Sequence, residues 1–598
     1  MTPARAESSL FLAYPPAEHQ TTADRIFLIG TANPERPVLV NGEPIADRSV
    51  SGHFAPTIPL ALGENVLTLT QGDDSLTVVI MRVPATPTVP PEVGYLADSL
   101  TPQVDITRQP GELVCFSAIA APNADISVDW GGAEIPLAPL ANAVTLPPNS
   151  AVLTGQNEPV PLIATPYEGC TIVPATGPLG QPAYSMTFSD LAEPVSDAAA
   201  DSEQHDAAVT NVATRSRLVT QNAPGSIERM PIHPFQVAEV TTESGVARTG
   251  PSTNYSRITP LPRGTRATVT GTEGEWLRLD YGGWIRASET TVTTAAAPAK
   301  SIIRSVTAQQ IPGWTEVRFP LQVPVPVSVD QTPDTLTLTL HNTTPQTDTI
   351  YLDADPVIER LDWTPILPDK AQYRFQLRQP QQWGYKLRYE GTTLVLSLKH
   401  PPQLANHSSL AGITILIDPG HGSENDLGAR GPNGYPEKDV NLVVSNLLRD
   451  ALEAQGATVV MTREGDDDLF PRDRVDIINQ VEPTLALSIH YNALPDAGDA
   501  LNTAGIGMFW YNTQSHSLAQ FLHDYLVDTL GRPSYGVYWN NLALTRPTVA
   551  PAVLLELGFM INPYEFEWIT DPEAQQTLTA TLAEAIALWM QQSSISQP

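Results

Sequence analysis

The spacing of apolar residues changes once along the chain, near residue 410. Before that point, short apolar runs alternate with polar residues and are separated by Gly, Pro, Asn and Asp turns, as in "PVLVNGEPI" and "DTLTLTLHN". Alternation with a period of two residues is typical of β-strands. After residue 410, buried strand-like runs such as "ITILID" alternate with amphipathic helical segments such as "NLVVSNLLRDALEAQG". The chain is therefore predicted to be multidomain, with all-β modules followed by a C-terminal α/β domain that has a mostly parallel sheet.

A chain of 598 residues is too long for one hydrophobic core, so we expect several domains. The first β module resembles the short immunoglobulin-like modules of bacterial surface proteins, and nothing in it suggests chemistry, so a spacer is favoured. The acidic segment after the second module has too few apolar side chains to form a core, which predicts disorder. The predicted boundaries are 20–85 for the immunoglobulin-like module, 98–190 for a β domain of unknown type, 191–230 for the disordered acidic linker, 233–292 and 301–402 for two further β domains, and 410–593 for the α/β domain.

Charge and hydropathy exclude two kinds of partner. Acidic residues outnumber basic residues 65 to 33, giving a net charge of -32, so nucleic acid and anionic membranes should repel the chain. No apolar run approaches the roughly 20 residues of a spanning helix, which predicts no membrane span. The sequence does not indicate protein partners or an oligomeric state.

Two features bear on the compartment in which the protein works. The run Ala4-Arg5-Ala6 resembles the end of a signal peptide whose apolar part is missing from the start of the sequence. We therefore expect an extracytoplasmic protein, in the periplasm or the cell wall. The two cysteines, Cys115 and Cys170, are not spaced as metal ligands. They fit one disulfide or two buried free thiols equally well.

The two β domains that precede the α/β domain resemble known wall-associated modules. Residues 233–292 contain "ARTGPSTNYSRI", Gly turns and two tryptophans, Trp276 and Trp284. This pattern resembles the bacterial SH3-like domain, which implies binding to peptidoglycan or its cross-bridge peptides. The tryptophans alone would also fit the core of a small barrel. Residues 301–402 resemble the AMIN-type β domains that precede cell-wall amidases, with a rigid spacer as an equal alternative.

Five polar residues lie at strand ends or at a helix start in the α/β domain. Asp418 and His421 follow "ITILID", His490 ends "TLALSIH", Glu556 lies late in "AVLLELGF", and Glu437 opens the first helix. Ligands of an open α/β sheet bind beyond the carboxyl ends of its strands. These side chains are therefore predicted to meet at one edge of the sheet.

Most of these residues also have an ordinary explanation. His421 fits a turn, His490 a strand end, and Glu437 the positive end of a helix dipole. Glu556 is different, because a carboxylate between "AVLL" and "LGF" would be desolvated unless it were paired or near a metal. Two histidines and one carboxylate match the ligands of catalytic zinc sites, which predicts Zn²⁺ with Glu556 as general base. Asp418 and Asn492 are candidates for orienting the ligands.

The motifs "DPGHG", "EKD", "MTR", "SIHYNA" and "PAVLLELGFMIN" resemble the zinc-dependent N-acetylmuramoyl-L-alanine amidases of the amidase-3 family. The resemblance implies that His421, Glu437 and His490 hold the zinc and that Glu556 is the catalytic residue. It also implies cleavage of peptidoglycan between N-acetylmuramic acid and L-alanine by zinc-activated water, in wall remodelling or daughter-cell separation. The alternatives are a non-catalytic wall-binding scaffold and a zinc peptidase that acts on another amide.

Three details of this region differ from the family pattern or vary within it. Ser423 replaces a glycine and has no explanation from the sequence. Tyr491 replaces the more common alanine, and we expect it to narrow the cleft. The segment "LPDAGDALNTA" is too short and too rich in turn residues for the autoinhibitory helix of some family members, so none is expected.

Overall fold

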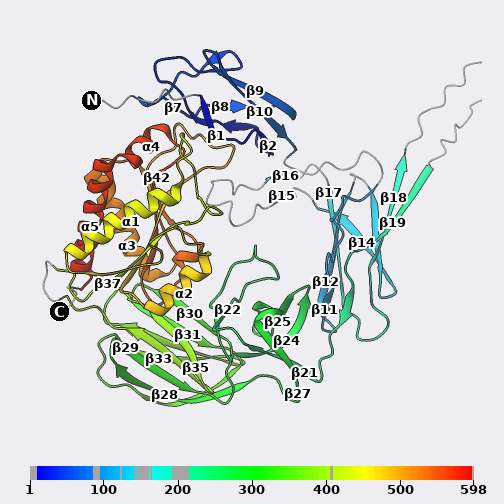
Figure 1. The fold of residues 1–598 in the computed structure, drawn as a ribbon. Coiled ribbons are helices and arrows are strands. Elements are labelled where there is room, and N and C mark those ends of the chain that lie inside the picture. The colour runs from blue at the N-terminus through cyan, green and yellow to red at the C-terminus, as the bar shows by residue number, and fades with distance from the viewer. Residues whose placement is uncertain are drawn as a thin grey trace, which may run out of the picture. The chain divides into compact units, whose positions relative to one another are not determined.

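The chain folds into two compact units that are not continuous in sequence (Figure 1). The structure is a computed structural model that describes residues 10–84, 94–120, 124–140, 144–145, 160–161, 165–190, 215–404 and 409–594. The first unit contains residues 1–83 and 300–598, and most of residues 84–299 form the second. The N-terminal module therefore belongs with the α/β domain, although more than 200 residues separate them in the sequence.

The α/β domain is built on a six-stranded sheet. The strand order is β38-β37-β39-β42-β40-β41. The first four strands are parallel, and the last two run antiparallel to them, which confirms an α/β domain with a mostly parallel sheet. The strands are β37 (Thr414–Pro419), β38 (Thr458–Met461), β39 (Leu485–Asn492), β40 (Ile506–Trp510), β41 (Ser534–Trp539) and β42 (Ala552–Phe559).

Helices cover both faces of this sheet. On α1, Val440, Val444, Leu448 and Leu452 recur at helical spacing and are fully buried. They share one core with α3, α5 and alternate strand residues, while α2 packs on the opposite face. Leu447, next to these residues on the helix, is only partly buried. The helices are α1 (Glu437–Ala454), α2 (Pro471–Val481), α3 (Thr513–Leu530), α4 (Pro563–Thr570) and α5 (Pro572–Ser594).

The β domain before the α/β domain is a two-sheet sandwich that is fixed to it. Trp383 packs against Trp589 of α5 at a ring-centroid distance of 5.5 Å. Lys399 Nζ donates hydrogen bonds to the carbonyls of Glu482, Pro483 and Val549. One sheet contains β28 (Ser301–Ile311), β29 (Trp314–Pro320), β32 (Thr343–Tyr351), β35 (Tyr385–Glu390) and β36 (Thr393–Lys399). The other contains β30 (Val327–Thr332), β31 (Thr335–Leu340), β33 (Ile358–Ile366) and β34 (Lys370–Leu377).

The N-terminal module is a small assembly of short strands with its own apolar core. Asn41 and Gly42 both have positive φ, 51° and 89°, and form the predicted tight turn. The strands begin at Phe11, earlier than the predicted boundary at residue 20. They are β1 (Phe11–Tyr14), β2 (Glu18–Thr21), β3 (Arg25–Phe27), β4 (Ile29–Thr31), β5 (Leu39–Val40), β6 (Glu43–Pro44), β7 (His53–Phe54), β8 (Thr57–Pro59), β9 (Gly63–Gln71) and β10 (Asp74–Arg82).

The second unit also consists of β-strands. A six-stranded sheet contains β12 (Leu113–Ala120), β13 (Asp125–Trp130), β14 (Ala133–Pro139), β17 (Thr165–Ile172), β18 (Ala183–Asp190) and β19 (Arg215–Asn222). A seven-stranded sheet contains β11 (Ile106–Arg108), β20 (Ile227–Arg229), β21 (Phe235–Val240), β24 (Arg266–Glu273), β25 (Trp276–Leu279), β26 (Trp284–Arg286) and β27 (Thr290–Ala295). Two short pairs are β15 (Val144–Thr145) with β16 (Val160–Pro161) and β22 (Ser244–Gly245) with β23 (Leu261–Pro262).

The predicted boundaries within this unit need two corrections. Residues 215–222 and 227–229 were expected in the disordered linker, but they form β19 and β20. Strand β19 pairs with β18 along its whole length, so tertiary pairing overrides the weak local signal. Strand β11 was assigned to the preceding domain, but it pairs with β24 of the SH3-like region. Residues 191–214 of the predicted linker lie outside the described residues.

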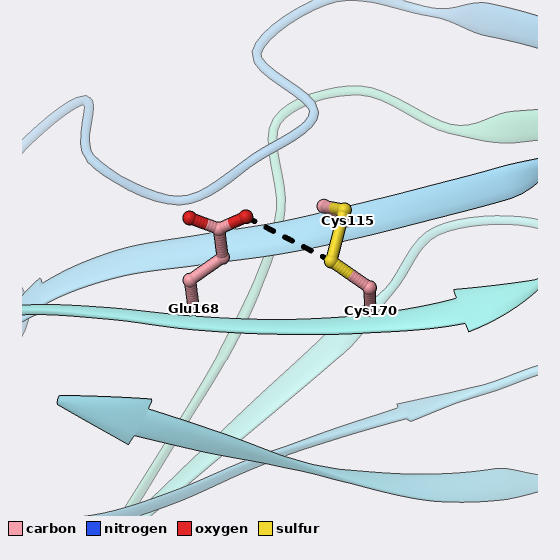
Figure 2. A group of neighbouring side chains, drawn as sticks. All are labelled: Cys115, Glu168 and Cys170. Atoms are coloured by element: carbon pink, nitrogen blue, oxygen red, sulfur yellow. Dashed lines mark hydrogen bonds between the residues drawn. A yellow bond between two sulfur atoms is a disulfide. The ribbon is translucent and has the colours of Figure 1, made fainter. Parts of the chain in front are cut away.

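Cys115 and Cys170 form a disulfide (Figure 2). They lie directly opposite each other on β12 and β17, with Cα atoms 4.0 Å apart. Glu168 lies beside them, with Oε1 3.7 Å from Cys170 Sγ. The two sulfurs bond each other and are therefore not thiolate ligands, and disulfides persist mainly in oxidising compartments. In the part of the chain that the structure describes, no helix is long and apolar enough to cross a membrane.

Candidate metal centre

The carboxyl ends of three strands bring the predicted site residues to one edge of the sheet. His421 lies in the turn after β37 and has a left-handed backbone with φ 58°. His490 on β39 and Glu556 on β42 are paired in the parallel register. Glu437 is the first residue of α1, where the positive end of the helix dipole favours a carboxylate.

Glu437 lies between the two histidines. Its Oε2 is 3.2 Å from His421 Nε2, and its Oε1 is 3.2 Å from His490 Nδ1. The histidine rings are nearly perpendicular, with centroids 5.1 Å apart. One nitrogen or oxygen from each of the three residues lies within 4.8 Å of the others, a group that could hold a metal ion.

The backbone and one amide side chain also fix the Glu437 carboxylate. Its Oε2 accepts the N–H of Ala429 at 2.8 Å, and its Oε1 accepts the N–H of Tyr491 at 3.0 Å. Asn441, one turn further along α1, donates Nδ2 to the same Oε1 at 3.1 Å. Burial raises the pKa of Glu437, but hydrogen bonds and charges from His421 and His490 outweigh this effect and bring the pKa below its usual range. The carboxylate is therefore held in place and ionised.

His421 is oriented from its other side. Its Nδ1 lies 2.6 Å from Asp426 Oδ1, so Nε2 is the nitrogen that faces Glu437. Burial lowers the pKa of His421, but the hydrogen bonds and charges of Glu437 and Asp426 raise it to about 9. Arg474 on α2 donates Nη2 to the His421 carbonyl at 2.5 Å and Nη1 to Asp418 at 2.6 Å. Asp418 therefore acts on the His421 turn through Arg474.

Two glycines let the backbone approach the histidines closely. A Cβ atom on Gly420 would lie 2.2 Å from the His490 ring. Gly428 has φ +68°, and a Cβ there would lie 2.4 Å from Glu437 Oε2 and 2.6 Å from His421 Cδ2. A larger residue at either position would displace the candidate ligands.

Glu556 lies next to this group but does not belong to it. Burial, together with the negative charge of Glu437, raises the pKa of Glu556 well above its usual value. Its Oε2 is buried without a hydrogen-bond partner among the described residues. A buried carboxylate oxygen without a partner is costly in a purely structural role, so the site fits an occupant that the protein atoms alone do not provide.

Four features around the site that the sequence analysis raised have different outcomes. Asn492 Oδ1 accepts the N–H of Ala493, a local bond that does not reach a candidate ligand. Tyr491 does not narrow the cleft, because its side chain is 1% exposed in the helix-covered core, on the opposite face of β39 from His490. Ser423 now has an explanation: it accepts the N–H of Asn425 and donates to Asp468 at 2.8 Å, which ties the His421 loop to a neighbouring loop. The segment 493–505 contains turns and no helix, as expected.

Four supporting residues were not singled out from the sequence: Asp426, Asn441, Arg463 and Arg474. Arg463 donates to the carbonyls of Pro419, Gly420 and Lys438 and so holds the turn that carries His421. It lies in the "MTR" motif, which was a usable signal. No sequence motif marks Arg474, because its partner Asp418 lies on a strand more than 50 residues earlier.

The α/β domain thus places two histidines and one carboxylate, a group that could hold a metal ion, at the carboxyl edge of its parallel strands. The family model described as N-acetylmuramoyl-L-alanine amidase matches residues 415–588, and the bacterial SH3 domain model matches residues 245–291. The germination-specific N-acetylmuramoyl-L-alanine amidase of Bacillus subtilis is 34% identical over 199 residues, 30% of this chain and 79% of that protein. The chain therefore belongs to the N-acetylmuramoyl-L-alanine amidase family.

Other relatives match a similar share of the chain. The probable cell wall amidase LytH of Staphylococcus aureus is 34% identical over 183 residues, 30% of this chain and 59% of that protein. Among solved structures, the catalytic domain of CwlV, an N-acetylmuramoyl-L-alanine amidase from Bacillus (Paenibacillus) polymyxa var. colistinus, is 28% identical. That comparison covers 30% of this chain and 97% of the other, with a TM-score of 0.28.

Proposed function

We propose that this protein is a zinc-dependent hydrolase that cleaves the amide between N-acetylmuramic acid and L-alanine in peptidoglycan. The observation that carries the proposal is the group of His421, Glu437 and His490 beside Glu556, whose Oε2 is buried without a hydrogen-bond partner among the described residues. Two imidazoles and one carboxylate form a donor set that suits catalytic zinc. Membership of the amidase family supports the choice of bond.

In this proposal His421, Glu437 and His490 hold the metal, and Glu556 moves protons. Bound zinc would act as a Lewis acid, polarising the scissile carbonyl and making a water molecule more acidic. Glu556 accepts a proton from the attacking water and passes it to the leaving amide nitrogen. Burial and the charge of Glu437 raise the pKa of Glu556, which favours proton uptake by this carboxylate. Asp426, Asn441 and Arg463 hold the ligands and their turns in place.

The rest of the chain supports action outside the cytoplasm. The Cys115–Cys170 disulfide is consistent with an oxidising compartment. The match of residues 245–291 to the bacterial SH3 domain supports attachment to the wall, with peptidoglycan as both partner and substrate. We include in the proposal a periplasmic or cell-wall location and a role in wall remodelling or cell separation.

Metal removal tests the proposal directly. We expect purified full-length protein with zinc to release new L-alanine amino termini from peptidoglycan, and a strong chelator to abolish the release. Adding zinc back should restore it, while adding magnesium should not, because imidazole ligands suit zinc. Amino-terminal analysis of the soluble products measures the reaction.

The same assay separates the alternatives. Binding to sacculi without release of amino termini would indicate a non-catalytic scaffold. New amino termini on residues other than L-alanine would indicate a peptidase acting on another amide. Activity that survives complete removal of zinc would contradict the metal role of the three ligands.

A further inference from the structure

The N-terminal module packs directly on the α/β domain (Figure 1). An apolar cluster joins Phe27, Ile29 and Ala55 of the module to Ala500, Phe559 and Ile561 of the α/β domain, all at most 3% exposed. Phe27 and Ile29 lie outside the module's own core cluster. Their burial therefore depends on the α/β domain, as in a permanent interface rather than a flexible tether.

Polar contacts at the same interface reach the segment that follows His490. Tyr14 donates its hydroxyl to Asp496, and His19 Nε2 lies 2.9 Å from the other oxygen of that carboxylate. Arg25 Nε donates to the carbonyl of Ala497 at 2.8 Å. The module thus holds residues 496–497, shortly after the end of β39.

A third set of contacts reaches the turn before Glu437 and helix α4. The Phe11 ring lies over Gly434, three residues before Glu437, where an added Cβ would be 3.2 Å from Phe11 Cζ. His53 packs edge-on against Phe566 of α4, with ring centroids 5.3 Å apart, and Ser51 N–H donates to Glu567.

A continuous packed path leads from the module to Glu556. Phe559, in the interface cluster, lies three residues after Glu556 on the same strand. The Tyr535 ring packs edge-on against Phe559 at 4.9 Å. Tyr535 also covers Gly507, which pairs with Glu556 across the sheet. If the module moved away, Phe559 would lose part of its packing, and the strand that carries Glu556 would be held less firmly.

We propose that the N-terminal module contributes to catalysis by keeping the active site in its reactive geometry. Asp496 and Phe559 are positioning residues, through which the module holds the segment after β39 and the strand that carries Glu556. The module acts on the reaction itself and not only on attachment to the cell wall. This inference rests on the proposed amidase function. It assigns a role to residues 10–83 that the family match, which covers residues 415–588, does not include.

Two substitutions in the full-length protein test the inference, each with a matched control. Phe27→Asp places a charge in the apolar interface, and Leu62→Asp places the same charge at a module position that is 62% exposed. Asp496→Asn weakens the contacts with Tyr14 and His19. Asp499→Asn makes the same change three residues later, at an exposed aspartate that bonds Asn502 within its own segment.

Each variant is assayed on sacculi and on a small soluble muramoyl peptide. We expect Phe27→Asp and Asp496→Asn to lower kcat on both substrates by about 10- to 100-fold, because small displacements of catalytic groups have effects of that size. The controls should match the parent protein. A loss confined to sacculi would mean that the module only tethers the enzyme. Unchanged or raised activity would also overturn the inference, and a rise would identify the module as an inhibitor.

A measurement independent of activity completes the test. Amide hydrogen exchange in residues 493–505 should speed up in Phe27→Asp and Asp496→Asn, while exchange in the middle of α5 stays as in the parent. Unchanged exchange in 493–505 would contradict the positioning role, and faster exchange throughout α5 would mean general unfolding. If the zinc-loaded parent cleaves neither substrate, the proposed amidase function fails, and the exchange data still decide whether the module holds this segment.

Discussion

Replacing Glu556 by Gln is expected to lower amide hydrolysis by about 100- to 10,000-fold, the contribution of a well-placed general base. Gln keeps the size of the side chain but cannot accept a proton from water. Because Glu556 is not part of the three-residue metal group, the variant should still bind zinc as the parent does. Initial rates on soluble muramoyl peptide and a zinc-binding titration measure the two effects separately.

The same substitution should leave the protein as stable as the parent or make it more stable. The Oε2 atom of Glu556 is buried and has no hydrogen-bond partner in the described structure. A neutral amide costs less to bury than an ionised carboxylate. Glu573→Gln, on the exposed surface of α5, is the matched control and should change neither activity nor stability.

Two results would contradict the role of Glu556. If Glu556→Gln retained activity within a few-fold of the parent, another group would have to move the proton. If the variant lost zinc together with activity, Glu556 would be a ligand, and the division of roles among the four residues would be wrong.

The sequence predicted the α/β domain well because its strands and helices have strong periodic patterns. It missed β41 and α4, each for a specific reason. Strand β41 is an edge strand with a glycine in a short aromatic run, "SYGVYW", that lacks a clear alternation. Helix α4 has only eight residues, but Asn562 caps it and Pro563 opens it, a start signal that was available in the sequence.

The candidate site residues could be predicted from local rules, whereas the residues that support them could not. His421, His490 and Glu556 all follow from the rule that sites form at the carboxyl ends of parallel strands. The role of Arg474 depends on which helix packs against β37. The sequence around Arg474 and around β37 does not indicate this packing. Local rules could not predict that the N-terminal module packs on the α/β domain, because Phe27 and Phe559 are separated by more than 500 residues.

The largest expected loss of stability comes from Asp418→Ala. The Asp418 carboxylate lies 2.6 Å from Arg474 Nη1 and accepts hydrogen bonds from Thr462 and Ser488. The side chains of Asp418 and Arg474 are only 1% and 4% exposed. Removing Asp418 leaves the Arg474 charge buried without its counterion, which should cost about 3 to 5 kcal/mol. Hydrogen exchange of the β37 and β39 amides measures this loss within the α/β domain.

The loss of stability in Asp418→Ala should become smaller as the pH falls into the acid range. Burial raises the pKa of Asp418, but the charge of Arg474 and hydrogen bonds from Ser488, Thr462 and Arg474 hold the pKa below its usual value of 3.8. A carboxylate with a depressed pKa contributes stability above its unfolded pKa and loses that contribution as the pH falls through its folded pKa. The gap between parent and Asp418→Ala should therefore be constant above about pH 5 and narrow in acid.

A double substitution separates the ion pair from simple loss of packing. In Asp418→Leu/Arg474→Met both charges are absent and the volume is kept, so the protein should be more stable than Asp418→Ala. Zinc affinity should nevertheless stay below that of the parent by about 10- to 100-fold, because Arg474 no longer holds the His421 carbonyl. Recovery of stability without recovery of zinc affinity would show that the pair is retained to position the ligand. Full recovery of both would contradict that role.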